Sequence, residues 1–113
     1  MTGGGGGGGN GGGGNGNGGT ECQTVYRGAR LNAPRKSVLS KLAEGDKLEL
    51  DVRPEGTSYS LYALSSGKEA GVVTHKAIAQ IIRCIQEGHT YVAEITTLDG
   101  GNCTLDLRME SPK

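Results

Sequence analysis

The amino-acid sequence predicts a small, mainly β or α+β domain: a partly open six-stranded β-barrel or sheet with one long and one short helix. Three observations support this prediction. Several short segments alternate apolar and polar residues, one longer segment has apolar residues at helical spacing, and glycine-containing turn signals separate these segments. A short-turned meander before the long helix and a closing hairpin after it favour a barrel with that helix plugging one end. A sheet with both helices on one face is the alternative.

The strands are predicted from alternation and from turn chemistry. In residues 47–53, Leu48, Leu50 and Val52 alternate with charged residues, which is typical of a half-buried strand. A Pro-Glu-Gly-Thr turn at 54–57 comes next, because proline presets φ and glycine accepts a positive φ. The first strand is expected at a sheet edge, with a bulge at Gly28. The six predicted strands cover residues 22–31, 47–53, 58–64, 70–73, 91–98 and 103–109.

Two helices are predicted. The long helix spans about 74–87, with Thr74 as its N-cap and Gly88 as its stop. Its apolar positions are 77, 78, 81, 82 and 85, so one face of the helix is apolar. The short helix spans about 35–42, because Pro34 suits a first helical turn and Gly45 suits the position after a helix end.

The chain divides into two unequal parts. Fourteen of its 22 glycines lie in residues 1–19, and after Met1 no apolar side chain occurs before Cys22. Such a segment cannot bury enough surface to offset the entropy of ordering it, so residues 1–20 are predicted to form a disordered Gly/Asn-rich tail. Residues 21–113 are long enough for a single compact domain.

The overall charge gives no argument for nucleic acid or membranes as partners, since 12 basic residues balance 12 acidic ones. Residues 22–43 are an exception, because they hold five basic residues and no acidic one: Arg27, Arg30, Arg35, Lys36 and Lys41. A solvated surface of mixed sign is one interpretation of this segment, and an anion-binding face is the other. The N-terminus lacks a secretory signal, and no apolar run has membrane-spanning length. We therefore expect a cytoplasmic location with reduced thiols.

No catalytic arrangement of residues is recognisable. Cys84 and Cys103 fall among core positions, and a disulfide between Cys22 and Cys103 is the alternative to three reduced thiols. His75 and His89 lie at opposite ends of about 20 Å of helix, so a shared metal is not expected. The glycine motifs that bind phosphate are also missing from the sequence. We therefore expect a non-enzymatic protein with no catalytic residue, no metal and no cofactor.

Several turn and core positions occur together in the middle of the chain. They are Gly45-Asp46 before a strand, Gly71-Val72-Val73 before the helix at 75–87, and Gly88 followed by Tyr91 and Ala93. This pattern resembles HIRAN-type domains over about 55 to 75 residues. The resemblance implies a small β-barrel. It also suggests a small bacterial stand-alone member of a family that is also found attached to helicase-like and nuclease enzymes.

The better understood HIRAN-type domains bind single-stranded DNA ends in a pocket that uses aromatic and basic residues. This role transfers only to Tyr26, Arg27 and Arg30, and the chain has no Phe. A bulge at Gly28 would bring Arg27 and Arg30 to one face of their strand. We expect a module that contacts single-stranded nucleic acid or DNA ends, as an accessory to DNA processing. The residues expected to make these contacts are Tyr26, Arg27, Arg30, Arg35 and Lys36.

The alternative hypothesis is a protein-interaction domain with no nucleic-acid role. In that case an exposed first or last strand would pair with a partner's sheet or with a second copy of the chain. A third hypothesis, a thiol-dependent enzyme, requires an exposed and acidic cysteine. The first two hypotheses involve neither a membrane nor a small-molecule cofactor.

Overall fold

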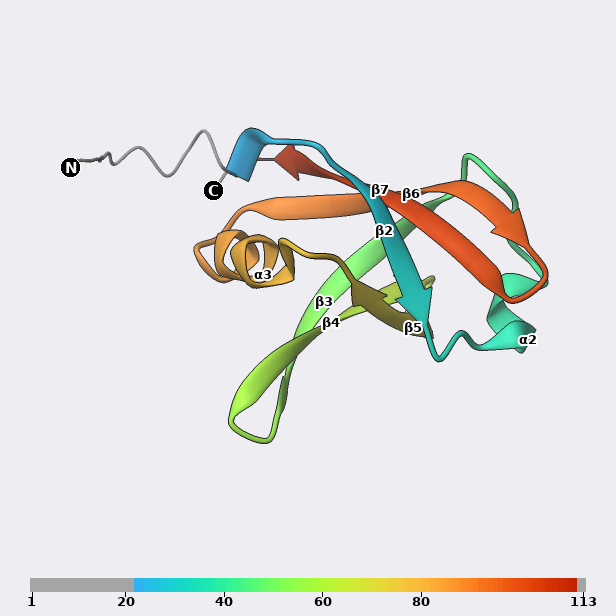
Figure 1. Cartoon of the computed structure of the whole chain (residues 1–113), viewed down its shortest axis with the longest axis horizontal. Coiled ribbons are helices and arrows are strands. Elements are labelled where there is room, and N and C mark those ends of the chain that lie inside the picture. Colours follow the sequence, from blue (N-terminus) through green and yellow to red (C-terminus); the bar gives the residue numbers. More distant parts are fainter. Residues whose placement is uncertain (1–21, 112–113) are drawn as a thin grey trace.

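The computed structural model describes residues 22–111 (Figure 1). The predicted tail at 1–20 lies outside the described residues, as do residues 21, 112 and 113. The strands are β2 (Tyr26–Asn32), β3 (Lys47–Glu55), β4 (Ser58–Ser65), β5 (Lys68–Thr74), β6 (Thr90–Asp99) and β7 (Asn102–Ser111). The helices are α2 (Lys36–Leu39) and α3 (Ile78–Gln86). Among the residues described, no helix is long and apolar enough to cross a membrane.

The six strands form a closed antiparallel barrel in the order β2-β5-β4-β3-β6-β7. The prediction of a mainly β fold with six strands is confirmed, but the expected partly open arrangement is wrong. The barrel closes because β2 pairs on both sides, with Leu31 opposite Val73 of β5 and Ala29 opposite Leu105 of β7. The first strand is therefore not a sheet edge.

The barrel interior is filled by aliphatic side chains from alternate strand positions. Leu48, Leu61, Ile95, Leu105 and Leu107 are all fully buried. The apolar side chains that alternate along β3, β4 and β7 therefore point inward as expected. Burial of one face of each strand is what fixes its register. Small residues share this interior, so a core without Phe or Trp still packs.

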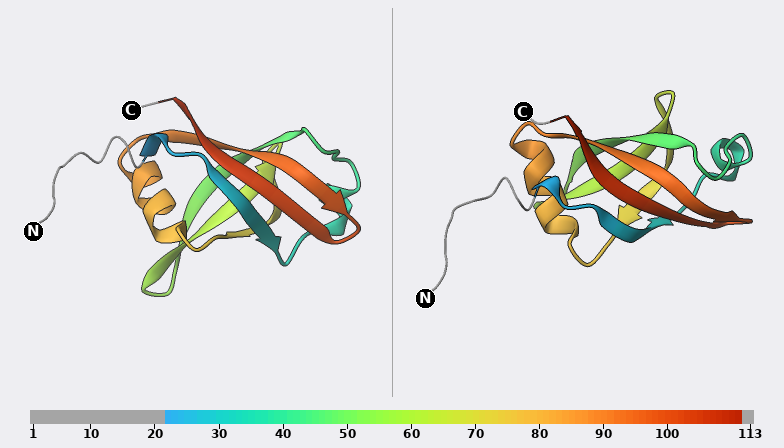
Figure 2. Two further views of the ribbon diagram at one scale, coloured as in Figure 1. Left: turned by 45° about the horizontal axis from the view of Figure 1, so that its top comes forward. Right: turned by 90° about the horizontal axis from the view of Figure 1, so that it is seen from above.

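The helices α2 and α3 lie at opposite ends of the barrel (Figure 2). The alternative of a sheet with both helices on one face is therefore wrong. From α3, Ile81, Ile82 and Cys84 are buried. This apolar face packs against the hydrophobic core, as its helical spacing predicts.

Both helices are shorter than predicted. Thr74 ends β5 instead of capping α3: it pairs with Arg30, and its hydroxyl donates to the Arg30 carbonyl at 3.3 Å. Ala77 is the N-cap of α3. Pairing with β2 thus extends β5 to Thr74, although threonine by itself favours the start of a helix. In the same way Pro54 continues β3 opposite Tyr59, so the turn begins after it.

A disulfide joins Cys22 to Cys84, whose Cα atoms are 5.6 Å apart, and both residues are buried. The expectation of reduced thiols and the alternative pairing of Cys22 with Cys103 are therefore both wrong. Cys103 is a free, buried cysteine on β7, as its position on the apolar face predicts. Sequence periodicity cannot show which turn of α3 meets the start of the domain, because that contact joins residues 62 positions apart.

Candidate functional site

A bulge in β2 determines where its two arginines lie. The pairing of β2 with β7 shifts register between Tyr26 and Ala29, and Gly28 has φ +77°. In a regular strand, Arg27 and Arg30 would point to opposite faces because side chains alternate. The extra residue of the bulge breaks this alternation, and glycine accepts the positive φ that the bulge requires.

Both arginines line one hollow of about 510 Å³ beside the barrel. We name it the basic hollow, and its lining residues are Arg27, Gly28, Arg30, Thr74, His75 and Lys76. β2 supplies the first three of these residues, and the end of β5 with the following turn supplies the other three. The predicted pair of arginines is thus brought together, with Lys76 as a third cation that the sequence reasoning did not single out.

The basic hollow carries an excess of positive charge. Arg27 forms an ion pair with Asp106 of β7 at 3.1 Å, yet its side chain remains 77% exposed. Asp106 also accepts a hydrogen bond from the Gly28 amide at 3.4 Å. In residues 22–111, the exposed side chains of Arg30 and Lys76 take part in no ion pair. Three cations therefore face one neutralising carboxylate.

His75 is held in a fixed orientation at the edge of the hollow. Its Nδ1 accepts a hydrogen bond from the Ala77 amide at 2.9 Å, so the neutral ring carries its proton on Nε2. Nε2 then donates to the Arg27 carbonyl at 3.0 Å. The ring also meets Tyr26 edge to face, with centroids 5.8 Å apart. The sequence pattern assigned His75 no role in binding, although this residue directly follows β5, the strand that pairs with β2.

Tyr26 has a different position from the one its predicted role requires. It is half-buried, packs against the hydrophobic core and does not line the basic hollow. Its contact with His75 instead supports the imidazole, which is the aromatic ring within the hollow. A base stacking in this hollow would therefore meet His75 before Tyr26.

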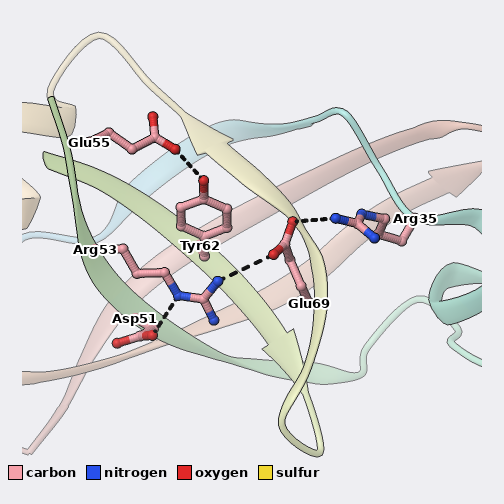
Figure 3. A network of polar contacts seen from close by, with 6 residues as sticks. All are labelled: Arg35, Asp51, Arg53, Glu55, Tyr62 and Glu69. Atoms are coloured by element: carbon pink, nitrogen blue, oxygen red, sulfur yellow. Dashed lines mark hydrogen bonds and ion pairs between the residues drawn. The ribbon is translucent and has the colours of Figure 1, made fainter.

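Arg35 belongs to a separate network of ion pairs (Figure 3). Glu69 of β5 forms ion pairs with both Arg35 at 3.3 Å and Arg53 at 3.2 Å. Arg53 also forms an ion pair with Asp51 at 2.9 Å. The Arg53 guanidinium lies 4.6 Å from the centre of the Tyr62 ring. Arg35 is therefore neutralised by a carboxylate that also holds a second arginine, unlike Arg30 in the basic hollow.

The same network perturbs two more groups. The Tyr62 hydroxyl donates to Glu55, and this bond raises the pKa of Tyr62 and lowers the pKa of Glu55. Ser60 donates to the other Glu55 oxygen at 2.9 Å, which lowers the pKa of Glu55 further. The hydrogen bond from Arg53 to Asp51 likewise raises the pKa of Arg53. These polar groups satisfy one another, which is typical of a structural surface network.

The remaining predicted contact residue, Lys36, lies on α2. It lines a smaller hollow of about 270 Å³ with Leu39, Leu98 and neighbouring glycines. The five predicted residues are thus divided. Arg27 and Arg30 share the basic hollow, Tyr26 supports its wall, and Arg35 and Lys36 lie apart from it.

The described cysteines offer no exposed thiolate nucleophile. Cys22 and Cys84 are joined in the disulfide, and Cys103 is buried on β7. Burial raises the pKa of the Cys103 thiol, which keeps it protonated. The exposed acidic cysteine that a thiol-dependent enzyme requires is therefore not present among residues 22–111.

The chain matches no protein-family model, and neither a curated protein nor a solved structure is significantly similar to it. The resemblance to HIRAN-type domains therefore stays a prediction. The functional argument depends on the geometry of the basic hollow and on the charges that line it.

Proposed function

We propose that this chain is a non-enzymatic binding module that contacts single-stranded nucleic acid or a DNA end through the basic hollow. The observation that carries the proposal is the bulge at Gly28, which places Arg27 and Arg30 beside Lys76 and His75. Arg30 and Lys76, two of the three cations in the hollow, have no ion-pair partner in the described part of the chain. A phosphate bound by Arg30 and Lys76 would therefore not have to break an existing salt bridge first.

The chemistry of the hollow suits a nucleic-acid backbone. Arginine binds phosphate oxygens through two parallel N–H donors, and lysine adds a compact charge. The His75 ring would support a base, since aromatic and imidazole rings stack on unpaired bases. Zero net charge on the whole chain does not oppose this, because screening confines the relevant field to roughly 10 Å around the hollow.

The HIRAN-like resemblance supports the same proposal and extends it. A small barrel with a DNA-end site would act in the cytoplasm of a bacterium as an accessory to DNA processing. Disulfides persist chiefly in oxidising compartments, so in a reducing cytoplasm the Cys22–Cys84 bond of the structure would be open to reduction.

The test is a fluorescence-anisotropy titration of a labelled single-stranded oligonucleotide at low salt. The double variant Arg30→Ala/Lys76→Ala is expected to bind about tenfold or more weakly. The matched control, Lys36→Ala/Lys41→Ala, removes the same charge from the α2 region and is expected to bind within about twofold of the unaltered chain. Equal losses in both variants would contradict the proposal, because they would indicate non-specific attraction.

Salt dependence gives an independent measure of the same contact. Three phosphate contacts to a single strand predict a slope of about −2 for log K against log salt. The Arg30→Ala/Lys76→Ala variant is expected to flatten this slope to about −0.7, since one cation of the hollow remains. No salt-sensitive binding at low ionic strength would rule out the proposed contact.

The pairing of the strands within the barrel bears on the alternative of edge-strand pairing. The first and last strands of the described barrel, β2 and β7, are hydrogen-bonded to each other. Where they pair with each other, β2 and β7 therefore offer no free edge of the kind that β-augmentation requires, and pairing of another stretch of strand with a partner stays a prediction. Self-association through another surface stays a prediction, and sedimentation of the purified chain measures it.

A further inference from the structure

Four side chains with metal-binding atoms meet at the end of the barrel that carries α3. A sulfur of Cys22, a carboxylate oxygen of Glu87 and a ring nitrogen of His89 all lie within 4.8 Å of one another. Cys84 adds a second sulfur, since it is bonded to Cys22. We name these four residues the cysteine–histidine cluster. They lie at a different place from the basic hollow, so a role for this cluster is independent of the proposed function.

The end of α3 has the local structure that gathers three of these residues. Cys84 lies in the last turn, Glu87 is the C-cap, and Gly88 has φ +109°. The Gly88 amide donates to the Ile85 carbonyl at 3.0 Å, and the His89 amide donates to the Cys84 carbonyl at 3.2 Å. These two bonds form a Schellman motif, which folds the chain back over the helix end. His89 is thereby brought beside the turn that carries Cys84.

Cys22 has a backbone anchor besides the disulfide. The hydroxyl of Tyr91, a buried residue of β6, donates to the Cys22 carbonyl. This bond does not involve either sulfur atom. Reduction of the disulfide would therefore leave Cys22 attached to the barrel next to Cys84, Glu87 and His89.

We propose that reduction of the Cys22–Cys84 bond turns the cysteine–histidine cluster into a zinc site. Its donors are two thiolates, one imidazole and one carboxylate. Zinc binds these ligand types in tetrahedral geometry, at about 2.3 Å from sulfur and about 2.0–2.2 Å from nitrogen or oxygen. The start of the domain is thus fastened to α3 by a disulfide under oxidising conditions and by zinc under reducing ones.

Conversion of the disulfide into a tetrahedral zinc site requires only small movements. In a tetrahedral site the two sulfurs lie about 3.8 Å apart, given zinc–sulfur bonds of about 2.3 Å. Rotation of the two cysteine side chains provides this separation while the Cα atoms stay near their present 5.6 Å. The donor atoms of Glu87 and His89 are already close enough to Cys22 to reach a shared ion.

The redox step is balanced by a cellular dithiol. Its two thiols give up two electrons and two protons and become a disulfide, and the Cys22–Cys84 bond becomes two thiols. Zinc then displaces the two thiol protons and binds both thiolates. In the oxidised chain the sulfurs are bonded to each other and supply no thiolate, so the site is closed to the metal.

The test uses the full chain and Co²⁺ as a spectroscopic probe. The chain is reduced with a phosphine under argon, desalted and titrated with Co²⁺, in parallel with an oxidised sample. The reduced chain is expected to bind one equivalent, with the intense visible bands of tetrahedral cobalt and a thiolate charge-transfer band, and Zn²⁺ is expected to bleach both. The oxidised chain is expected to show neither band. Absence of the bands from the reduced chain would overturn the proposal.

Variants then identify the ligands. His89 is half-buried and Glu87 is exposed, so the fold is expected to persist in His89→Ala and in Glu87→Gln. Circular dichroism checks this. Each is expected to weaken zinc binding by about tenfold or more in competition with a chromophoric chelator. His75→Ala, before the other end of α3, and Cys103→Ser are the controls and are expected to bind zinc normally. Unchanged zinc affinity in His89→Ala would overturn the proposed ligand set.

Discussion

Tyr91 shows how a single hydroxyl connects distant parts of this small domain. Its side chain is 4% exposed, and its hydroxyl donates to the carbonyl of Cys22, 69 positions earlier in the chain. Burial, with a smaller contribution from Tyr26, raises the pKa of Tyr91 to about 12. The hydroxyl is therefore a permanent donor over the ordinary pH range.

Removing that donor is expected to destabilise the fold. In Tyr91→Phe the Cys22 carbonyl loses its partner in a buried setting, which costs about 1–2 kcal/mol of unfolding free energy. Denaturant unfolding measures this difference. Tyr59→Phe is the matched control, because Tyr59 is 53% exposed, and it is expected to change the unfolding free energy by less than about 0.5 kcal/mol. Equal effects of the two substitutions would show that the hydroxyl of Tyr91 has no special role.

The raised pKa of Tyr91 also predicts how stability depends on alkaline pH. In the unfolded chain a tyrosine ionises near pH 10, whereas folded Tyr91 resists ionisation until about 12. Its contribution is therefore complete below about pH 10 and is lost as pH rises toward 12, because the unfolded state releases its proton first. The unfolding free energy of the unaltered chain should fall more steeply above about pH 10 than that of Tyr91→Phe. Parallel curves would contradict this assignment.

At the scale of elements, the strand β2 decides both the closure of the barrel and the shape of the candidate site. Its bulge at Gly28 groups the arginines, and its C-terminal half packs closely on β5. At Gly71 of β5, an added Cβ would lie 2.7 Å from Leu31 Cγ and 2.8 Å from the Asn32 carbonyl oxygen. Backbone and a buried leucine cannot both give way, so only glycine fits here.

The substitution Gly71→Ala is therefore expected to lower stability by about 1–3 kcal/mol, through forced separation of β2 from β5. Thermal and denaturant unfolding provide the measurement. Gly101→Ala is its control, since a Cβ added at Gly101 meets nothing within 4 Å, and it is expected to be close to neutral. A neutral Gly71→Ala would mean that β2 can shift without cost.

At the scale of the whole molecule, the disulfide fastens the start of the domain to the helix that covers one barrel end. It joins residues 62 positions apart and so encloses most of the described chain. Cross-links of this length restrict the unfolded chain strongly, which favours the folded state. The barrel also contributes a continuous aliphatic core, so the disulfide adds to a fold that is already closed by strand pairing.

Reduction in the absence of metal is expected to lower the unfolding free energy by about 4 kcal/mol, the chain-entropy value for such a loop. Denaturant unfolding of oxidised and reduced chain measures it. The double variant Cys22→Ser/Cys84→Ser is expected to resemble the reduced chain and to be insensitive to reductant. An equal stability of oxidised and reduced chain would show that the cross-link does not restrict unfolding.

Much of the fold could be predicted residue by residue, but the candidate site could be predicted only in part. The alternation of Leu48, Leu50 and Val52 and the apolar face of α3 are local patterns, and they correctly indicated which faces are turned toward the core. Arg27 and Arg30 were found through a local signal, the glycine between them. Lys76 was missed because no local sequence pattern indicates that the turn that carries it lies beside β2.

By itself, the sequence determined the number of strands, their inward faces, the hairpin turns and the position of the amphipathic helix. These features depend on side-chain periodicity and on the φ preferences of glycine and proline, which act over a few residues. The tertiary structure alone decided that β2 closes the barrel with β7, that Cys22 meets Cys84, and that Glu87 and His89 lie beside them. Such contacts depend on strand register and on which distant segments the core brings together, and no local preference encodes them.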